Sequence, residues 1–467
     1  MCSEDSDIME GTSGTKVLLS DPKVAIPALA VPLAVAIFVQ NFNSMADTMW
    51  AAWLGGSAVA GLGLAYPLYA AIVGIGNGLG IGVAAAIARC VGLSDREGAT
   101  RSAGQSLLLA LAASVLVAVP LVVFAEPLMY AFGAGAAGPD AVAYGMPIFA
   151  GSFFVIAGSV MSGVLRGEGA ARRSMVIQVA GALFNMVLDP VLMYGLGMGV
   201  AGAGLATVAA GALSLCLGLY YYVGADDMYV RFRIRDLRPD WPVAKEILCV
   251  GLPESAEYMV MSLINIPMNY IIVGVGDPNV VGTYTSAWRV GYMVLIPCQA
   301  LSGGVVSVCS TEYARGRADL VAEAYRFTAR RSVLHTFYLS VLLALLSYPI
   351  ACMFTASDDI SYLRDNMTVC LLCLAALLPM MSMVFVGSAF LQSLEHSEIG
   401  FLSSLIRNIL MVSGYFAMAA VFRSTEAIWV IMAVIEVAGG ALMAWLAKVY
   451  IGRFGDSCLR GGTGNTS

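Results

Sequence analysis

Charged residues are scarce in this chain. Only 12% of its 467 residues are Asp, Glu, Lys or Arg, against ~25% in an ordinary soluble domain. Hydrophobic residues make up 59%. A soluble protein of this composition would need an apolar core larger than its few polar residues could shield from water. The formal net charge is −6 and the basic residues are spread over short segments, which excludes the concentrated positive field that nucleic-acid binding needs. The composition indicates an integral membrane protein. We expect membrane lipids, and not nucleic acid, among its partners.

Histidine is almost absent and cysteine follows no pattern. The two histidines, His335 and His396, lie far apart, and the 10 cysteines mostly stand singly in apolar runs. These spacings match neither a disulfide framework nor a zinc site. The amino terminus is polar and acidic, without the basic-then-apolar order of a signal peptide. We therefore expect no metal centre, no cofactor and an amino terminus that stays in the cytoplasm.

Long apolar runs dominate the rest of the sequence. A membrane-spanning helix needs ~20 apolar residues, and runs of that length follow one another along the chain. They lie near residues 25–54, 58–90, 103–124, 140–163, 174–196, 199–223, 245–274, 280–310, 330–354, 362–390, 398–422 and 426–450. This pattern predicts an all-α polytopic membrane protein with twelve transmembrane helices.

The basic residues set the expected orientation. All but four of the 25 Lys and Arg lie in the tails or in loops that follow even-numbered spans; the exceptions are Arg289, Arg364, Arg407 and Arg423. The positive-inside rule then places both termini in the cytoplasm of a multi-pass plasma-membrane protein. The expected segments are an amino tail 1–24, an amino-terminal lobe 25–223, a cytoplasmic linker 224–244, a carboxyl-terminal lobe 245–452 and a carboxyl tail 453–467.

An internal repeat relates the two halves. Three pairs of residues share one offset, Pro32 with Pro253, Gly55 with Gly276 and Gly82 with Gly303, and a second match pairs Asn185 with Asn408. Because each copy holds an even number of spans, both copies have the same orientation in the membrane. The prediction is two parallel six-helix repeats around a central cleft, an architecture that suits alternating access.

Polar residues form stripes inside two of the apolar spans. Gln40 and Asn43 precede Asp47 by seven and four residues, so all three lie near one face of the first span. Asn185 and Asp189 are related in the same way in the fifth span. A carboxylate at the bilayer centre costs a few kcal/mol, so it is retained for a partner, a cation or a proton.

These stripes carry hard oxygen ligands. Pro190 leaves a backbone carbonyl without its helical donor, and Thr207 could add a hydroxyl, although a Thr in a transmembrane helix also bonds back to its own carbonyl. Carboxylates, an amide oxygen and a hydroxyl suit Na⁺, or a proton shared between two carboxylates. At the repeat offset Asp47 and Asp189 have no acidic counterpart, which favours a single ion site in the amino-terminal half.

The carboxyl-terminal half has acids of its own. Glu254 and Glu257 lie in the seventh span, where they could pair with Arg289 of the eighth, and Glu436 lies in the twelfth. A structural pair explains these residues as well as a transport role does.

At these residues the sequence resembles the multidrug and toxic compound extrusion family of secondary transporters. The resemblance covers residues ~25–450 and rests on Asp47, the run Asn185-Met-Val-Leu-Asp189-Pro190, the glycine-rich segment that leads to Thr207, and the loop Leu-Arg166-Gly-Glu168-Gly. It is strongest to the branch with the essential acids in its amino-terminal lobe. The resemblance implies a cation site at Asp47, Asn185, Asp189 and Thr207, with Gln40 and Tyr144 nearby and Pro32 at the bend of the first span.

The implied function is export of small organic, often cationic and lipophilic compounds, driven by Na⁺ or H⁺. Aromatic side chains such as Trp50 could bind organic cations, and Gln40, Asn43, Tyr144, Glu257 and Arg289 are candidates for contacts with substrate or protons. A lipid-linked precursor flippase is the main alternative. An intramembrane enzyme would need a nucleophile with its base, or a metal set, and a channel needs no repeat with unequal acids. A monomer is the default expectation.

Overall fold

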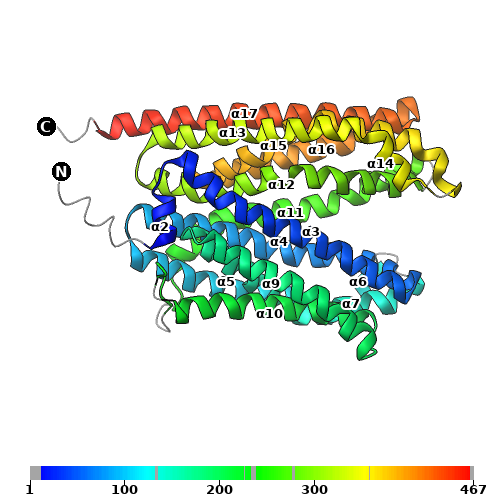
Figure 1. The fold of residues 1–467 in the computed structure, drawn as a ribbon, viewed down its shortest axis with the longest axis horizontal. Helices are drawn as coiled ribbons and strands as arrows, with labels where there is room; N and C mark the ends of the chain where they lie inside the picture. The colour runs from blue at the N-terminus through cyan, green and yellow to red at the C-terminus, as the bar shows by residue number, and fades with distance from the viewer. Residues whose placement is uncertain are drawn as a thin grey trace. The chain divides into compact units, whose positions relative to one another are not determined.

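The computed structural model describes residues 12–131, 135–225, 227–232, 238–275, 279–356 and 358–462. These residues form helices and turns, with no strand among them (Figure 1). Ten helices are long and apolar enough to cross a membrane, and up to 12 spans result if each of two bent helix pairs counts as one. The expected all-α polytopic fold is confirmed.

The chain divides into two compact units, Met1–Met259 with Val306–Arg315, and Val260–Val305 with Gly316–Ser467. The boundaries fall inside two long helices, α11 (Trp241–Val275) and α12 (Asn279–Ala314). Unit 1 otherwise contains α2 (Ser13–Leu18), α3 (Pro22–Leu54), α4 (Gly56–Gly92), α5 (Arg96–Val123), α6 (Ala125–Ala131), α7 (Gly138–Ala150), α8 (Ser152–Gly167), α9 (Ala171–Pro190) and α10 (Val200–Gly224). Unit 2 otherwise contains α13 (Ala318–Leu345), α14 (Ser347–Phe354), α15 (Arg364–Ser393), α16 (Ser397–Phe422) and α17 (Thr425–Gly462).

Small residues let α4 approach its neighbours closely in unit 1. A Cβ on Gly163 of α8 would overlap the carbonyl oxygen of Gly80, and a Cβ on Gly82 would overlap the carbonyl oxygen of Ile247 in α11. Glycine therefore permits backbone-to-backbone packing of α4 on both sides, as in packed transmembrane helices generally.

Two of the expected spans are broken. The run expected at 140–163 bends by 56° between α7 and α8, and the run expected at 330–354 bends by 62° between α13 and α14. Pro147 and Pro349 lie close to these breaks and cannot donate the helical hydrogen bond four residues back, which weakens the helix there. Hydropathy reports the length of an apolar run but not its bends.

The ends of several helices meet the linker at one end of unit 1. Arg96, at the start of α5, donates hydrogen bonds to the carbonyl oxygens of Met228 and Tyr229, and Arg89 of α4 forms an ion pair of 2.8 Å with Glu246 of α11. The alternation of spans expected from the sequence brings these segments to the same side. Which side of the membrane this is stays a prediction.

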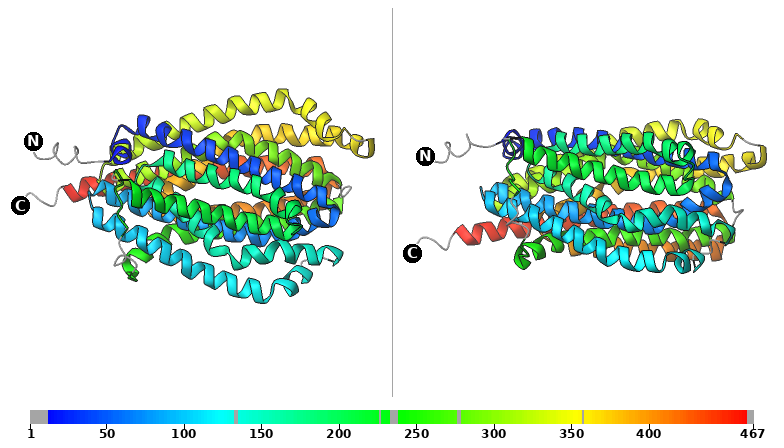
Figure 2. Two further views of the ribbon diagram at one scale, coloured as in Figure 1. Left: turned by 60° about the horizontal axis from the view of Figure 1, so that its bottom comes forward. Right: turned by 90° about the horizontal axis from the view of Figure 1, so that it is seen from below.

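The core of unit 2 contains large aromatic side chains. Trp429 of α17 and Tyr415 of α16 are both fully buried, and Trp429 stacks on Tyr284 of α12 with ring centroids 5.1 Å apart. In the further views of Figure 2 the last turns of α17, coloured red, run on beyond the other helices of their unit. These three aromatic side chains belong to a larger core of mostly aliphatic and Met side chains.

Candidate functional site

The polar stripe of α3 meets α9 through amide side chains. Asn43 donates from Nδ2 to Oδ1 of Asn185 over 2.8 Å. With the Asn185 amide turned over, its nitrogen donates to Oδ1 of Asp47 over 3.1 Å and its oxygen accepts from the backbone N–H of Thr207 over 3.1 Å. In either orientation Asn185 joins α3 to α9, and in the second it also reaches α10. The structure therefore brings together the four residues predicted as the cation site.

Asp189 is the most deeply buried member of this site. Its side chain is 0% exposed, and neither carboxylate oxygen accepts a hydrogen bond from a donor among the residues that the structure describes. The carboxyl group of Asp47, which is half-buried, lies within hydrogen-bonding reach of it. Two carboxylates this close in an apolar bundle repel each other unless a proton or a cation lies between them.

The chain around Pro190 departs from regular α-helix. A π-turn, η3 (Val191–Gly195), follows the end of α9, and Pro190 cannot donate to the carbonyl of Met186. The hydroxyl of Tyr194 donates to the backbone carbonyl of Trp50, which ties this turn to α3. The sequence predicted the released carbonyl but not the π-turn, because proline identifies a break without giving its geometry.

The hydroxyl of Thr207 uses its proton within its own helix. It donates to the carbonyl oxygen of Ala203 over 3.0 Å, the back-bonding that is common in transmembrane helices. This bond leaves the hydroxyl oxygen with lone pairs for a cation. Two carboxylates, an amide, a hydroxyl and a backbone carbonyl together make a set of oxygen ligands that suits Na⁺ or a shared proton.

A chain of polar side chains continues from this site along α9. Gln40 donates to Gln178 over 3.0 Å, Gln178 donates to the hydroxyl of Ser174 over 3.1 Å, and that hydroxyl lies 2.8 Å from the hydroxyl of Ser162. Gln178 was not among the residues predicted from the sequence. Its spacing could have revealed it, because Gln178 precedes Asn185 by two helical turns and so shares its face.

Aromatic side chains flank the carboxylates. The phenols of Tyr69 on α4 and Tyr144 on α7 lie near enough to Asp47 and Asp189 to interact with them electrostatically. Trp50, one turn beyond Asp47 on α3, packs edge-to-face on Trp53 with centroids 5.1 Å apart. Tyr144 and Trp50 were predicted, whereas Tyr69 was not, since one tyrosine among many in apolar spans has no distinguishing pattern in the sequence.

The remaining predicted residues lie on separate elements. Pro32 is buried in α3, Glu257 is half-buried in the part of α11 that belongs to unit 1, and Arg289 is exposed on the part of α12 that belongs to unit 2. Their proposed roles stay predictions.

Glu168 forms a second buried polar centre, at the end of α8. Its carboxylate accepts hydrogen bonds from the hydroxyl of Tyr222 over 3.0 Å and from the backbone N–H groups of Tyr229 and Val230 over 3.1 Å each. Burial raises the pKa of Glu168 to about 7, although these hydrogen bonds and the nearby Arg173 favour the charged form. Arg173 in turn pairs with Asp227 over 2.7 Å. Glu168 thus holds Tyr229 and Val230 of the linker against the end of α8.

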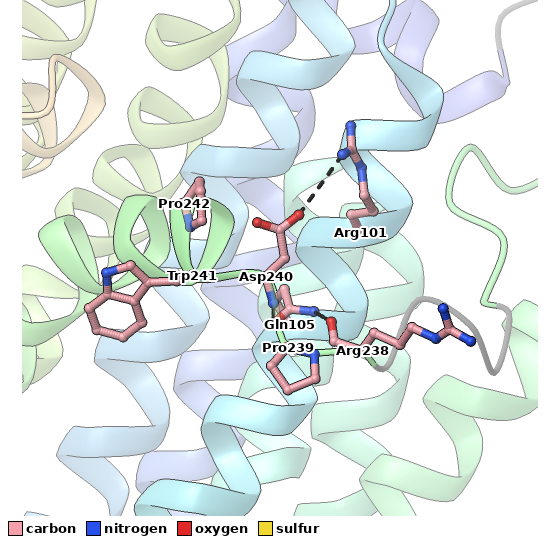
Figure 3. A pocket seen from close by; sticks show the side chains of 7 residues that line it. All are labelled: Arg101, Gln105, Arg238, Pro239, Asp240, Trp241 and Pro242. Atoms are coloured by element: carbon pink, nitrogen blue, oxygen red, sulfur yellow. Dashed lines mark hydrogen bonds and ion pairs between the residues drawn. The ribbon is translucent and has the colours of Figure 1, made fainter.

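A separate cavity of about 350 Å³ lies beside the same linker (Figure 3). Arg101 of α5 approaches the carboxylate of Asp240 to 3.9 Å, and Gln105 of α5 accepts a hydrogen bond from the backbone N–H of Asp240 over 3.0 Å. Its lining comes from α5 and from residues 238–242, none of which belongs to the carboxylate pair. We assign it no role in transport. Among the described residues no group of three or more His, Cys, Asp or Glu could hold a metal ion.

Comparison with known proteins places the chain in a family. The sequence model of the MatE family matches residues 32–191 and, a second time, residues 253–416. The two matches fall on the two halves related by the internal repeat.

Several proteins are similar over most of their length. The FAD transporter of Shewanella oneidensis is 24% identical over 71% of this chain and 74% of its own. The multidrug export protein MepA of Staphylococcus aureus (strain MSSA476) is 22% identical over 79% of this chain and 81% of its own. A structure described as an outward-facing multidrug resistance MATE family transporter superimposes with a TM-score of 0.90 at 28% identity, over 96% of this chain and 99% of its own. The chain belongs to the MatE family and is a multi-pass membrane transporter, not an enzyme.

Proposed function

We propose that this transporter exports small organic compounds, often cationic and lipophilic, in exchange for Na⁺ or H⁺ that enters through the amino-terminal half. The similarity to multidrug export proteins supports the class of cargo. The similarity to those proteins also favours export over the flipping of a lipid-linked precursor, which would call for a cationic groove.

The environment of the Asp189 carboxylate is the observation that supports coupling to a cation. This carboxylate is fully buried, accepts no hydrogen bond from a described donor and lies beside a second carboxyl group, that of Asp47. Asn or Ser could make the same structural hydrogen bonds at a smaller free-energy cost, because neither side chain buries a charge in the membrane. A proton or Na⁺ that comes and goes explains why two carboxylates are retained there.

Coupling then follows from electrostatics. A cation on Asp47 and Asp189 neutralises the site, and an organic cation nearby in the amino-terminal half would be less strongly attracted once that charge is gone. By reciprocity, bound cargo weakens cation binding by the same factor. The half-buried Asp47 is the first carboxylate that an entering cation meets, and Asp189 is the deeper one. The aromatic residues around them suit lipophilic cations.

The same proposal includes orientation. The basic loops favour a plasma-membrane protein with both termini in the cytoplasm, and the linker fastened by Glu168 is then cytoplasmic. A monomer suffices for this function, since each chain holds both lobes.

Drug accumulation in a susceptible host tests the proposal. Asp47→Asn and Asp189→Asn keep side-chain size and remove charge, so cells that produce either variant at parental levels should accumulate drug as if they had no transporter. Asp365→Asn, at an exposed position in α15, is the matched control and should export like the parent. If Asp47→Asn exports as well as the parent while Glu257→Gln is inactive, the coupling site lies on α11 and the proposal is wrong.

A further inference from the structure

Unit 2 contains a buried ion pair in its membrane-spanning helices. Nη1 of Arg407 on α16 lies 2.7 Å from Oε2 of Glu436 on α17, and each side chain is only 6% exposed. Nη2 of Arg407 also donates to the hydroxyl of Ser404 over 3.3 Å. Both helices qualify as membrane spans, so this charge pair lies in the apolar layer, where an ionised group needs a compensating partner.

The packing around Arg407 leaves room for its long side chain. Gly439 follows Glu436 by three residues, on the same face of α17. A Cβ at Gly439 would come 2.7 Å from Cδ of Arg407 and 3.3 Å from its Cγ. A larger residue there would displace the arginine stem. Gly439 thus leaves space for the aliphatic part of Arg407, and Glu436 pairs with its guanidinium.

The internal repeat shows that this pair is specific to the second half. Asn408, the neighbour of Arg407, is the counterpart of Asn185 in the candidate cation site, and α16 and α17 are the fifth and sixth spans of the second half as α9 and α10 are of the first. Asn408 is 6% exposed, and its Nδ2 has no hydrogen-bond partner among the described residues. At the offset that pairs Asn185 with Asn408, Arg407 matches Phe184 and Glu436 matches Leu213, so the ion pair has no counterpart in the amino-terminal half. There the Asp189 carboxylate has no basic partner among the described residues.

We propose that Arg407 is a built-in counter-ion that keeps the buried Glu436 from binding an exchangeable cation in the carboxyl-terminal half. Its guanidinium remains protonated under all physiological conditions and is tethered to the chain, so neither Na⁺ nor H⁺ displaces it from Glu436. The second half then contains a buried acid but binds no exchangeable cation at it. Without Arg407, Glu436 would be a buried anion that takes up a proton or Na⁺. The inference holds whether or not the amino-terminal site couples transport.

The experiment uses purified protein in which Asp47→Asn and Asp189→Asn silence the amino-terminal carboxylates. To this background we add Arg407→Met, which keeps the length of the stem without its charge, or the pair Arg407→Met/Glu436→Gln, which removes both charges. Arg89→Met is the matched control, because it also removes a buried arginine from a glutamate but leaves Glu246 with 37% of its side chain exposed to water. The readout is thermal stability, measured with Na⁺ or choline as the salt and between about pH 6 and about pH 8.

Arg407→Met should make stability fall more steeply with rising pH than the stability of the background does, and Na⁺ should restore it. The background, the Arg89→Met control and the double charge removal should keep the background slope, to which Glu168 contributes, and should not respond to Na⁺. A folded Arg407→Met variant with the background slope and no response to Na⁺ overturns the proposal. If Arg407→Met does not fold, recovery of folded protein on adding Glu436→Gln supports the proposal, and failure to recover overturns it, because the guanidinium would then be needed for more than neutralising Glu436.

Discussion

Replacing Glu168 by Gln should remove one specific component of the pH dependence of stability. The folded-state pKa of Glu168 is about 7 against an ordinary value of 4.5, so between these values the folded chain holds a proton that the unfolded chain has lost. Stability from this group is therefore fully present below pH 4.5 and is lost as the pH rises through about 7. At 1.36 kcal/mol per pH unit, the loss is on the order of 3 kcal/mol.

Gln resembles the protonated form of Glu168 in shape and keeps an oxygen that can accept from the N–H groups of Tyr229 and Val230. It does not titrate, so Glu168→Gln should be nearly as stable as the parent at low pH and more stable than the parent above pH 7. The measurement is the free energy of unfolding, or the melting temperature, of both proteins across this range. Glu126→Gln, at an exposed position in α6, is the control and should keep the parental slope. A parental slope in Glu168→Gln, or parental stability that rises with pH across this window, would refute the reasoning.

Other predictions follow from packing and from the ligand set. Gly163→Ala puts a methyl group against the carbonyl of Gly80 and should lower the unfolding free energy by about 1–3 kcal/mol, whereas Gly63→Ala in α4 meets nothing within 4 Å and should be neutral or slightly stabilising in a melting experiment. Asn185→Ala removes an amide ligand and should raise the half-saturating concentration of the coupling cation by about tenfold, equivalent to ~1.4 kcal/mol, without loss of folded protein. An unchanged concentration dependence would exclude Asn185 from the site. Tyr69→Phe should alter cation binding but not folding, and identical binding curves for Tyr69→Phe and the parent would show that its phenol does not act on the carboxylates.

Much of the fold follows from hydropathy and charge. Apolar runs of span length follow one another along the chain, so the number of spans can be read without contacts, whereas their direction stays a prediction from the basic loops. The breaks near Pro147 and Pro349 could not be placed, because several other prolines lie inside helices that do not break, as Pro67 does in α4. Bends depend on whether neighbouring helices compensate for the lost hydrogen bond.

The candidate site was predictable where residues share a helix. Spacing alone put Asn43 beside Asp47 and Asn185 beside Asp189. Two contacts were not predicted: the ion pair of Arg407 with Glu436, and the hydrogen bonds of Glu168 with the linker. In each case the partners lie on different segments, and a single sequence does not say which helix faces meet. Tertiary packing, not local pattern, decides such contacts.

Gradient-driven uptake into proteoliposomes tests the central claim most directly. Purified transporter would be reconstituted, a Na⁺ gradient or a pH gradient imposed separately, and the accumulation of a fluorescent lipophilic cation followed. At least one gradient should drive accumulation by the parent, and neither should drive it in Asp189→Asn, even though that variant still binds the dye. Accumulation by Asp189→Asn at the parental rate, or accumulation by the parent that is the same with and without either gradient, would contradict coupling through the Asp47–Asp189 site.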